Sequence, residues 1–266
     1  MYLNEIGIIG LGFVGNAIAS TMYDSGIDVV KVDIDSTRGN GTYADLMKCD
    51  GVFVCVPSPS NADGSCDTSI LESVLERLKD YEGVIISKCT IPPSKYTELN
   101  NQYKNLIYSP EFLTAANAKS DYMNAKFAII GGRIKAYASE AERLIKLTQP
   151  NLEIIEHCTI EEAALTKYAI NSFLATKVIF MNELQQVASA ANVNYEKIAR
   201  MVAFDNRIGK SHMQVPGHDG SFGFGGACFP KDTAALLKYA EGLGIHLNTL
   251  DAAVKKNTLL RLTEPK

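Results

Sequence analysis

The sequence predicts an α/β protein: a doubly wound parallel sheet in the first part of the chain, followed by an all-helical part with one long helix. Three observations predict this fold. Short apolar runs alternate with helical stretches, the first run leads into a glycine-rich turn, and an unbroken helical pattern then extends for about nine turns. We therefore expect two domains, residues 1–157 and residues 158–266.

Seven apolar runs are the predicted strands, because strands of a parallel sheet are buried on both faces. They span residues 5–10, 28–33, 51–56, 83–88, 105–109, 126–131 and 152–156. Between them, a helix over residues 16–26 ends at a glycine. Another helix, over residues 69–80, opens with Ser69 and Glu72 at the spacing of a capping box.

The second part of the chain shows helical patterns alone. Thr159 and Glu162 form another predicted capping box, ahead of the long helix over residues 161–192. Shorter helices are expected over residues 195–203, 233–244 and 248–262. A polar, glycine-rich loop connects the first two of these.

The composition excludes several classes of protein. A net charge of −4 lacks the basic excess of a nucleic-acid binder. Because no apolar run is long enough for a bilayer and no signal peptide is evident, we expect a cytoplasmic protein without a membrane partner. The six cysteines form no C-x-x-C pair, and His212 and His218 lack ligand partners at metal spacing, so neither disulfides nor a metal site is expected.

The segment GIIGLGFVGNAIAS contains Gly10, Gly12 and Gly15 at G-x-G-x-x-G spacing, after a predicted strand and at the start of a helix. The first glycine permits a tight turn, the second lets the backbone approach a pyrophosphate, and the third lets helix and strand pack closely. The helix N-terminus then faces the anion. We expect this Rossmann-type turn, including Phe13 and Val14, to bind a dinucleotide.

Asp33 and Arg38 bear on which dinucleotide binds. Asp33 ends the next strand, near the distance at which a carboxylate accepts the ribose hydroxyls, and it would repel a 2′-phosphate. Arg38 could stack on the adenine or neutralise a phosphate. NAD is therefore the expected cofactor, and Arg38 leaves NADP open as the alternative.

Two further groups are candidates for chemistry. Lys167 and Asn171 are spaced i, i+4 on the long helix, so a cation and a donor on one face could stabilise an oxyanion; an exposed polar stripe is the alternative.

Cys228 lies in GFGGACFPKD, where glycines leave the backbone room to approach a ligand and a nearby lysine favours the thiolate. A small buried apolar residue is the alternative there.

Seven motifs resemble, in the same order, those of the nucleotide-sugar 6-dehydrogenases of the UDP-glucose and GDP-mannose type. They are GLGFVG, VPSP, SKCTIP, YSPEFL, EEAALTKYAIN, DNRIG and SFGFGGACFPKD. The resemblance implies an NAD domain, a helical middle domain that forms a homodimer, and a C-terminal domain that helps to hold the nucleotide diphosphate of the substrate.

The resemblance also implies a reaction. A sugar C6 alcohol is oxidised to a carboxylate with two NAD⁺, through a thiohemiacetal and a thioester on a cysteine. By this resemblance Cys228 is the nucleophile, and Lys167 and Asn171 contact the substrate and stabilise its developing oxyanions. Asp232, with Thr90 through a water, serves in proton removal.

The remaining implied roles follow from the same motifs. Glu111 contacts the substrate and assists thioester hydrolysis. Cofactor contacts are implied for Ser58, Thr90 and Lys231, and sugar-nucleotide contacts for Arg207, Phe222 and Gly225.

The segment from Arg38 to Cys49 is much shorter than the family's usual link, and the sequence departs from the family pattern at two further places. The chain ends at Lys266, ahead of the family's third domain, and Thr114 and Ala115 follow EFL where the family has a basic residue and a glutamate. Both departures remove expected substrate contacts. Two alternatives stay open. A β-hydroxyacid-type dehydrogenase shares a Rossmann domain, a helical second domain and a lysine followed by asparagine four residues later, but has no covalent cysteine intermediate. A non-catalytic NAD-binding protein is the other.

Overall fold

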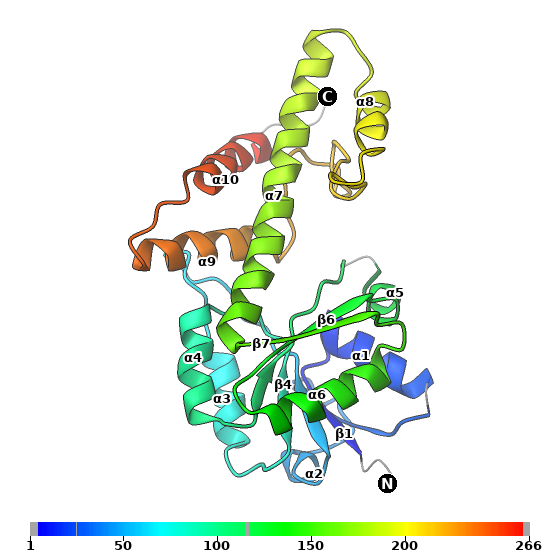
Figure 1. Cartoon of the computed structure of the whole chain (residues 1–266), viewed down its shortest axis with the longest axis vertical. Helices are drawn as coiled ribbons and strands as arrows, with labels where there is room; N and C mark the ends of the chain where they lie inside the picture. The colour runs from blue at the N-terminus through cyan, green and yellow to red at the C-terminus, as the bar shows by residue number, and fades with distance from the viewer. Residues whose placement is uncertain (1–4, 25, 115–116, 263–266) are drawn as a thin grey trace. The chain divides into compact units, whose positions relative to one another are not determined.

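The computed structural model describes residues 5–24, 26–114 and 117–262 (Figure 1). The chain divides into two compact units. The first contains residues 1–59 and 66–167, and the second contains residues 60–65 and 168–266. This division falls inside the long helix, whereas the sequence places the domain boundary just before it, so the limits of the two domains stay a prediction.

Within the described residues, seven strands form one sheet in the order β2-β1-β3-β4-β5-β6-β7. They are β1 Ile6–Ile9, β2 Val29–Val32, β3 Gly51–Val54, β4 Val84–Ser87, β5 Leu106–Tyr108, β6 Phe127–Gly131 and β7 Ile154–Cys158. Each predicted strand is present. Neighbours are parallel from β2 to β5, and again between β6 and β7.

One pair departs from the expected parallel arrangement. β6 runs antiparallel to β5, with Tyr108 opposite Gly131. The connection between them contains the short helix α5 (Ala118–Met123), which packs against α1 (Phe13–Asp24) and does not cross to the far edge of the sheet. β6 therefore starts at the edge where β5 ends and must run in the opposite direction. The sheet is mostly parallel.

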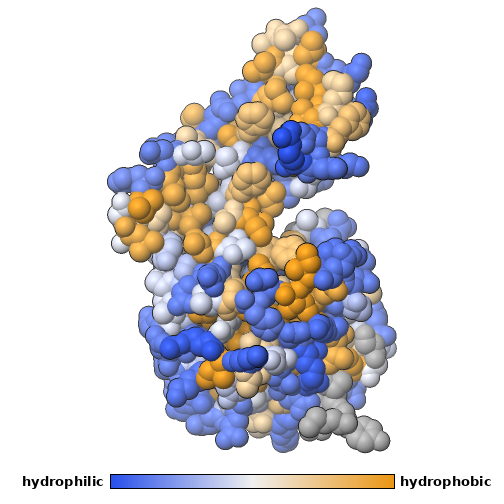
Figure 2. All heavy atoms as spheres, in the orientation of Figure 1, coloured by the Kyte–Doolittle hydropathy of each residue, from blue (hydrophilic) through white to orange (hydrophobic). Residues whose placement is uncertain are grey.

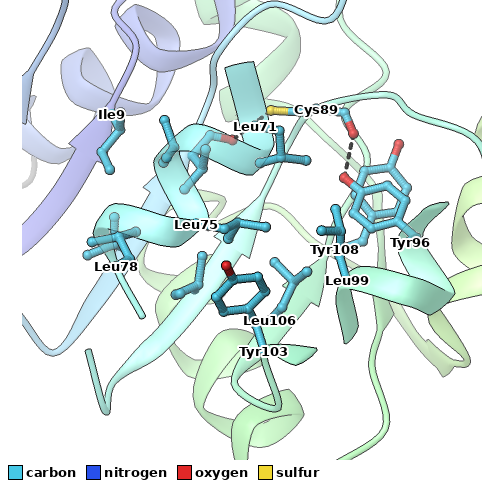
Figure 3. Close-up of a cluster of buried hydrophobic side chains, with 14 of the residues drawn as sticks. Ile9, Leu71, Leu75, Leu78, Cys89, Tyr96, Leu99, Tyr103, Leu106 and Tyr108 are labelled. Atoms are coloured by element: carbon cyan, nitrogen blue, oxygen red, sulfur yellow. Dashed lines mark hydrogen bonds between the residues drawn. The ribbon is translucent and has the colours of Figure 1, made fainter. Parts of the chain in front are cut away.

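Helices cover both faces of this sheet, which confirms the doubly wound fold. They are α1 Phe13–Asp24, α2 Tyr43–Leu46, α3 Ser69–Arg77, α4 Pro93–Gln102, α5 Ala118–Met123 and α6 Lys135–Thr148. Successive strand residues point to opposite faces, so Ile8 of β1 joins the buried cluster under α1 and α6, and Ile9 joins the one under α3 and α4. Figure 3 shows part of the second of these clusters.

One of the two predicted capping boxes is confirmed. The N–H of Thr159 donates to Glu162 Oε2 at 2.7 Å, and the N–H of Glu162 donates to Thr159 Oγ1 at 3.2 Å. The box at Ser69 and Glu72 is wrong, because Ser69 is already the first helical residue of α3. Thr68 precedes it and donates its hydroxyl to the Glu72 carboxylate at 2.5 Å.

The described part of the second unit consists of helices and loops. The long helix α7 Ile160–Ala190 enters it from the first unit, and α8 Tyr195–Val202, α9 Phe229–Gly242 and α10 Asn248–Arg261 follow. All four predicted helices are therefore present. α9 begins earlier than predicted, because Pro230 in its first turn needs no N–H partner and fits the start of a helix.

Among the helices that the structure describes, none combines the length and the apolar character needed to cross a membrane.

Candidate active site

The predicted dinucleotide turn joins β1 to α1. Gly10 has a φ of +87°, a conformation that glycine adopts without strain. A side chain at Gly15 would overlap the Gly10 carbonyl, whereas Gly12 has no atom within 4 Å of its Cβ position. Between the glycines, Phe13 is exposed and Val14 is half-buried. The geometry of the three glycines fits the separate roles that their spacing predicts, with open backbone at the helix N-terminus.

Asp33 and Arg38 lie beside this turn. Asp33 Oδ2 accepts the N–H of Leu11 at 2.6 Å, which holds the carboxylate against the glycine turn. Arg38 is exposed and pairs with Asp35, Nε to Oδ2, at 3.2 Å. Both Gly12 and Arg38 line an open hollow of about 480 Å³. The residues present fit a dinucleotide, with open backbone for a pyrophosphate and a carboxylate nearby for a ribose.

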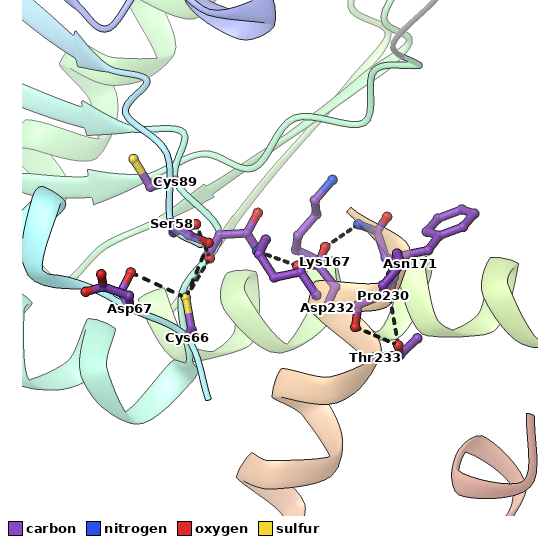
Figure 4. A network of polar contacts seen from close by, with 12 residues as sticks. Ser58, Cys66, Asp67, Cys89, Lys167, Asn171, Pro230, Asp232 and Thr233 are labelled. Atoms are coloured by element: carbon purple, nitrogen blue, oxygen red, sulfur yellow. Dashed lines mark hydrogen bonds and ion pairs between the residues drawn. The ribbon is translucent and has the colours of Figure 1, made fainter. Parts of the chain in front are cut away.

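The loops after β3 and β4 are tied together at the carboxyl edge of the sheet (Figure 4). The hydroxyl of Ser58 donates to the carbonyl oxygen of Thr90 at 2.8 Å, and the Cys66 thiol lies 3.6 Å from the same oxygen. The structure thus brings together Ser58 and Thr90, two predicted cofactor residues. The Ser58 hydroxyl holds the Thr90 backbone in place. Contacts of these two residues with the cofactor stay a prediction.

Lys167 and Glu111 meet within the first unit. Lys167 Nζ lies 2.5 Å from the backbone oxygen of Glu111 and 3.5 Å from its Oε1. The same amine lies 5.1 Å from the centre of the Phe112 ring, and the other carboxylate oxygen of Glu111 accepts the N–H of Leu113 at 2.7 Å. Lys167 is only 3% exposed. The exposed-stripe alternative is therefore wrong for this lysine, which faces a carboxylate instead of water.

Lys88 is a second buried amine, which the sequence analysis missed. It follows β4, is 5% exposed, and donates from Nζ to Ser109 Oγ at 3.0 Å. Burial lowers the pKa of Lys88 to about 8, while Cys55 and Glu111 oppose this shift. The available signal was a lysine at the end of the apolar run GVIISK. Its contact with Ser109 fixes the start of the segment that carries Glu111.

Asp232 is the centre of a buried polar group in the second unit (Figure 4). Its Oδ2 accepts Asn171 Nδ2 at 2.6 Å, and its Oδ1 lies 2.6 Å from Lys231 Nζ. Asp232 is 1% exposed. A buried carboxylate is costly unless it is paired and hydrogen-bonded, so both partners are needed here. Three predicted residues are thus brought together by α7 and the first turn of α9.

Cys228 directly precedes α9 and is exposed. The alternative of a small buried apolar residue is therefore wrong here, although it fits Cys49 and Cys89, which are buried. The carbonyl of Cys228 accepts the N–H of Asp232 at 2.8 Å. The first turn of α9 therefore fixes the thiol-bearing residue relative to the buried carboxylate.

Three predicted substrate residues belong to the second unit, and each has its own contacts within the protein. Arg207 is exposed and pairs with Asp205, Nη2 to Oδ2, at 2.6 Å. Phe222 is half-buried against an apolar cluster of this unit. At Gly225, a side chain would overlap the guanidinium of Arg261, so the space beside this glycine is filled by the protein. The substrate contacts of all three stay predictions.

Two other expectations concern neighbouring loops. Thr114 binds the Asp121 carboxylate through its N–H at 2.8 Å and its hydroxyl at 2.5 Å, whereas Ala115 lies outside the described residues. His212 is half-buried against Phe229, with ring centres 5.4 Å apart. Within the described ranges, no three His, Cys, Asp or Glu side chains form a group suited to a metal ion.

Comparison with known families identifies both parts of the chain. Residues 39–149 match the NAD binding domain of the UDP-glucose/GDP-mannose dehydrogenase family, and residues 161–259 match its central domain. The chain belongs to this family. The resemblance seen in the seven motifs is thereby confirmed, and so is NAD as the cofactor.

Two relatives illustrate the extent of the match. UDP-glucose 6-dehydrogenase AglM of Haloferax volcanii is 27% identical, over 95% of this chain and 69% of its own length. UDP-glucose 6-dehydrogenase TuaD of Bacillus subtilis is 28% identical, over 98% of this chain and 64% of its own length. The chain thus spans about two thirds of the length of these relatives of the dehydrogenase family.

Solved structures share the fold. A UDP-glucose dehydrogenase from Pyrobaculum islandicum superimposes with a TM-score of 0.84 at 24% identity, covering 97% of this chain and 68% of its own. A 3-hydroxyisobutyrate dehydrogenase from Mycobacterium tuberculosis reaches a TM-score of 0.74 at 16% identity, covering 96% of this chain and 92% of its own. At these identities both comparisons concern the fold alone.

Proposed function

We propose that the chain catalyses the NAD-dependent oxidation of a nucleotide-sugar C6 alcohol to the uronic acid, through a covalent intermediate on Cys228. The observation that carries this proposal is the exposed Cys228 at the start of α9, one turn ahead of the buried group of Asn171, Lys231 and Asp232. Membership of the family and the names of the relatives support it.

Each oxidation removes a hydride and a proton from the substrate carbon and its oxygen. NAD, when bound, accepts the hydride. Asp232, with Thr90 through a water, takes the proton, and Lys167 and Asn171 stabilise the oxygen as it becomes negative. The contact between Lys167 and Glu111 supports a shared role of these two residues, because it holds a cation beside the carboxylate proposed for the hydrolytic step.

Between the two oxidations, the Cys228 thiolate adds to the aldehyde carbon and gives a thiohemiacetal. Loss of a second hydride and proton converts this adduct into a thioester. Water, assisted by Glu111, then releases the carboxylate and regenerates the thiol. Each substrate molecule therefore yields two NADH and consumes one water.

The stoichiometry and the cysteine are tested together. The protein is incubated with NAD and a panel of UDP- and GDP-sugars, and NADH is followed by absorbance. We expect two NADH per sugar for the wild type. Cys228→Ser should form at most one NADH per sugar, because oxidation should stop at the aldehyde. Cys49→Ser is the matched control, because that cysteine is buried away from the proposed chemistry.

The same assay distinguishes the alternatives once β-hydroxy acids are added to the panel. A β-hydroxyacid-type dehydrogenase, whose fold is represented among the structural neighbours, would form one NADH per substrate and tolerate Cys228→Ser. A non-catalytic NAD-binding protein would bind NAD without forming NADH from any alcohol. Either result would refute the proposed reaction.

A homodimer through α7 is part of the proposal. Phe173, Phe180 and Val187 recur every seven residues on this helix and are 70%, 62% and 62% exposed. A seven-residue apolar repeat is the pattern of paired helices. Figure 2 shows that hydrophobic residues gather on the surface of the helical second unit.

A reactive thiol also needs a reducing compartment, so the cytoplasm is the proposed location.

A further inference from the structure

The backbone of Phe224, shortly before the candidate nucleophile, is held by side chains of α10. The N–H of Phe224 donates to Asn257 Oδ1 at 2.7 Å, and its carbonyl accepts Arg261 Nε at 2.8 Å. Beside it, the N–H of Gly223 donates to Asn182 Oδ1 on α7 at 3.0 Å. Both polar backbone groups of Phe224 are therefore satisfied by side chains from one distant helix.

These contacts explain two glycines of the loop. A side chain at Gly223 would overlap Asn257, and one at Gly225 would overlap Arg261. Gly223 also has a φ of +73°, which other residues rarely adopt. The sequence suggested that these glycines leave room for a ligand, but here the room is taken by the protein's own side chains. Gly226, in contrast, has no atom within 4 Å of its Cβ position.

The contacts are buried and reach both ends of the loop. Phe224 is 4% exposed and Asn257 is 9% exposed. The Phe224 ring stands edge-on to that of Phe229, the first residue of α9, with ring centres 6.2 Å apart. At the other end, Arg261 Nη1 pairs with Asp219 Oδ2 at 2.6 Å. A buried backbone group without a partner is unfavourable, so loss of these side chains would displace the loop.

We propose that Asn257 and Arg261 are positioning residues for Cys228. This proposal rests on the function proposed above. Phe224 is fixed through its N–H, its carbonyl and its ring, so the segment from Phe224 to Cys228 is anchored at both ends. A displacement of about 1 Å at a reacting atom can lower the rate by about a hundredfold. Neither residue is part of a motif that pointed to the site.

The anchoring is tested by hydrogen exchange of the intact protein, comparing Asn257→Ala, Asn257→Asp and Thr258→Ala. In Asn257→Ala we expect the amides of residues 222–228 to exchange at least tenfold faster while α7 and α10 stay protected. Asn257→Asp keeps an acceptor oxygen and should remain close to the wild type. Thr258 is the exposed neighbour on the same helix, and its substitution should change nothing.

Kinetics with NAD and a sugar nucleotide test the consequence for Cys228. Asn257→Ala should lower kcat at least tenfold and change KM for NAD much less, because the dinucleotide turn belongs to the first unit. Asn257→Asp should restore kcat. Arg261→Lys is the second variant should Asn257→Ala not fold. It keeps a cation for Asp219 but lacks the fork that also reaches the Phe224 carbonyl, so the same changes should occur.

Three results would overturn the proposal: unchanged exchange in residues 222–228, equal acceleration throughout the second unit, or faster loop exchange with unchanged kcat. If the wild type forms no NADH from any sugar nucleotide, the proposed function fails. Hydrogen exchange then still decides whether Asn257 anchors the loop.

Discussion

Replacing Gly12 and Gly15 by alanine, one at a time, separates cofactor approach from packing in the dinucleotide turn. A Cβ at Gly15 would overlap the Gly10 carbonyl, and this backbone atom can move only together with the turn. Overpacking of this kind costs about 1–3 kcal/mol. The lower entropy of the unfolded chain returns about 0.4–1 kcal/mol, so Gly15→Ala should destabilise the protein by about 1–2 kcal/mol.

Gly12→Ala should behave in the opposite way. Because no atom lies within 4 Å of the Cβ position, a methyl group there meets only solvent, and stability should be unchanged or rise by up to about 1 kcal/mol. The methyl group would occupy the space through which a pyrophosphate approaches the backbone. We expect NAD affinity to fall at least tenfold, which corresponds to about 1.4 kcal/mol.

Urea unfolding gives the stability of each variant, and titration with NAD gives its affinity. Wild-type affinity for NAD in Gly12→Ala would refute the role of this glycine in cofactor approach. An equal loss of stability in both variants would show that the two positions do not have separate roles.

Three further predictions concern other parts of the molecule. Burial lowers the pKa of Lys88 from 10.5 to about 8, so between these pH values the unfolded chain binds more protons than the folded one, and stability should rise with pH by up to about 3 kcal/mol. Urea unfolding of Lys88→Met should lack this rise. An identical pH profile for wild type and variant would contradict the role of Lys88. Thr159→Ala removes a confirmed capping interaction and should cost about 1 kcal/mol in urea unfolding; no change would mean that the cap is not needed. Phe180→Ser should shift sedimentation towards the monomer. Phe204→Ser, at a phenylalanine outside α7 that is slightly more exposed, should not, and equal effects of the two substitutions would contradict pairing through α7.

The inner strands β1, β3, β4 and β5 were predictable because they are buried throughout, and buried strands leave continuous apolar runs in the sequence. The direction of β6 was not predictable in this way. It depends on the route of the connection after β5, which is set by the packing of α5 against α1. The residue that precedes α3 was misassigned for a related reason: Thr68 and Ser69 are adjacent hydroxyl residues, and the sequence alone does not decide which of them lies ahead of the first helical turn.

The candidate site was predictable where its chemistry is local. The glycine turn and the spacing of Lys167 and Asn171 were found from the residues themselves, whereas Glu111 and Asp232 entered through the resemblance to the family. Lys88 was missed because its partner is a hydroxyl on the next strand's loop. Asn257 and Arg261 were missed because both bind backbone groups of a distant loop, and a backbone partner leaves no trace in the sequence.

Glycine shows most clearly why such contacts escape prediction. A glycine indicates that something approaches the backbone, but not what approaches it. At Gly12 the adjacent space is open, whereas at Gly223 and Gly225 it is filled by Asn257 and Arg261. Substitution at Gly12 should therefore weaken a ligand contact first, and substitution at Gly223 or Gly225 should disturb the loop first. The difference between Gly12 and the other two glycines lies in the tertiary packing around each Cβ position. The residue type is the same in both loops, so it cannot predict that packing.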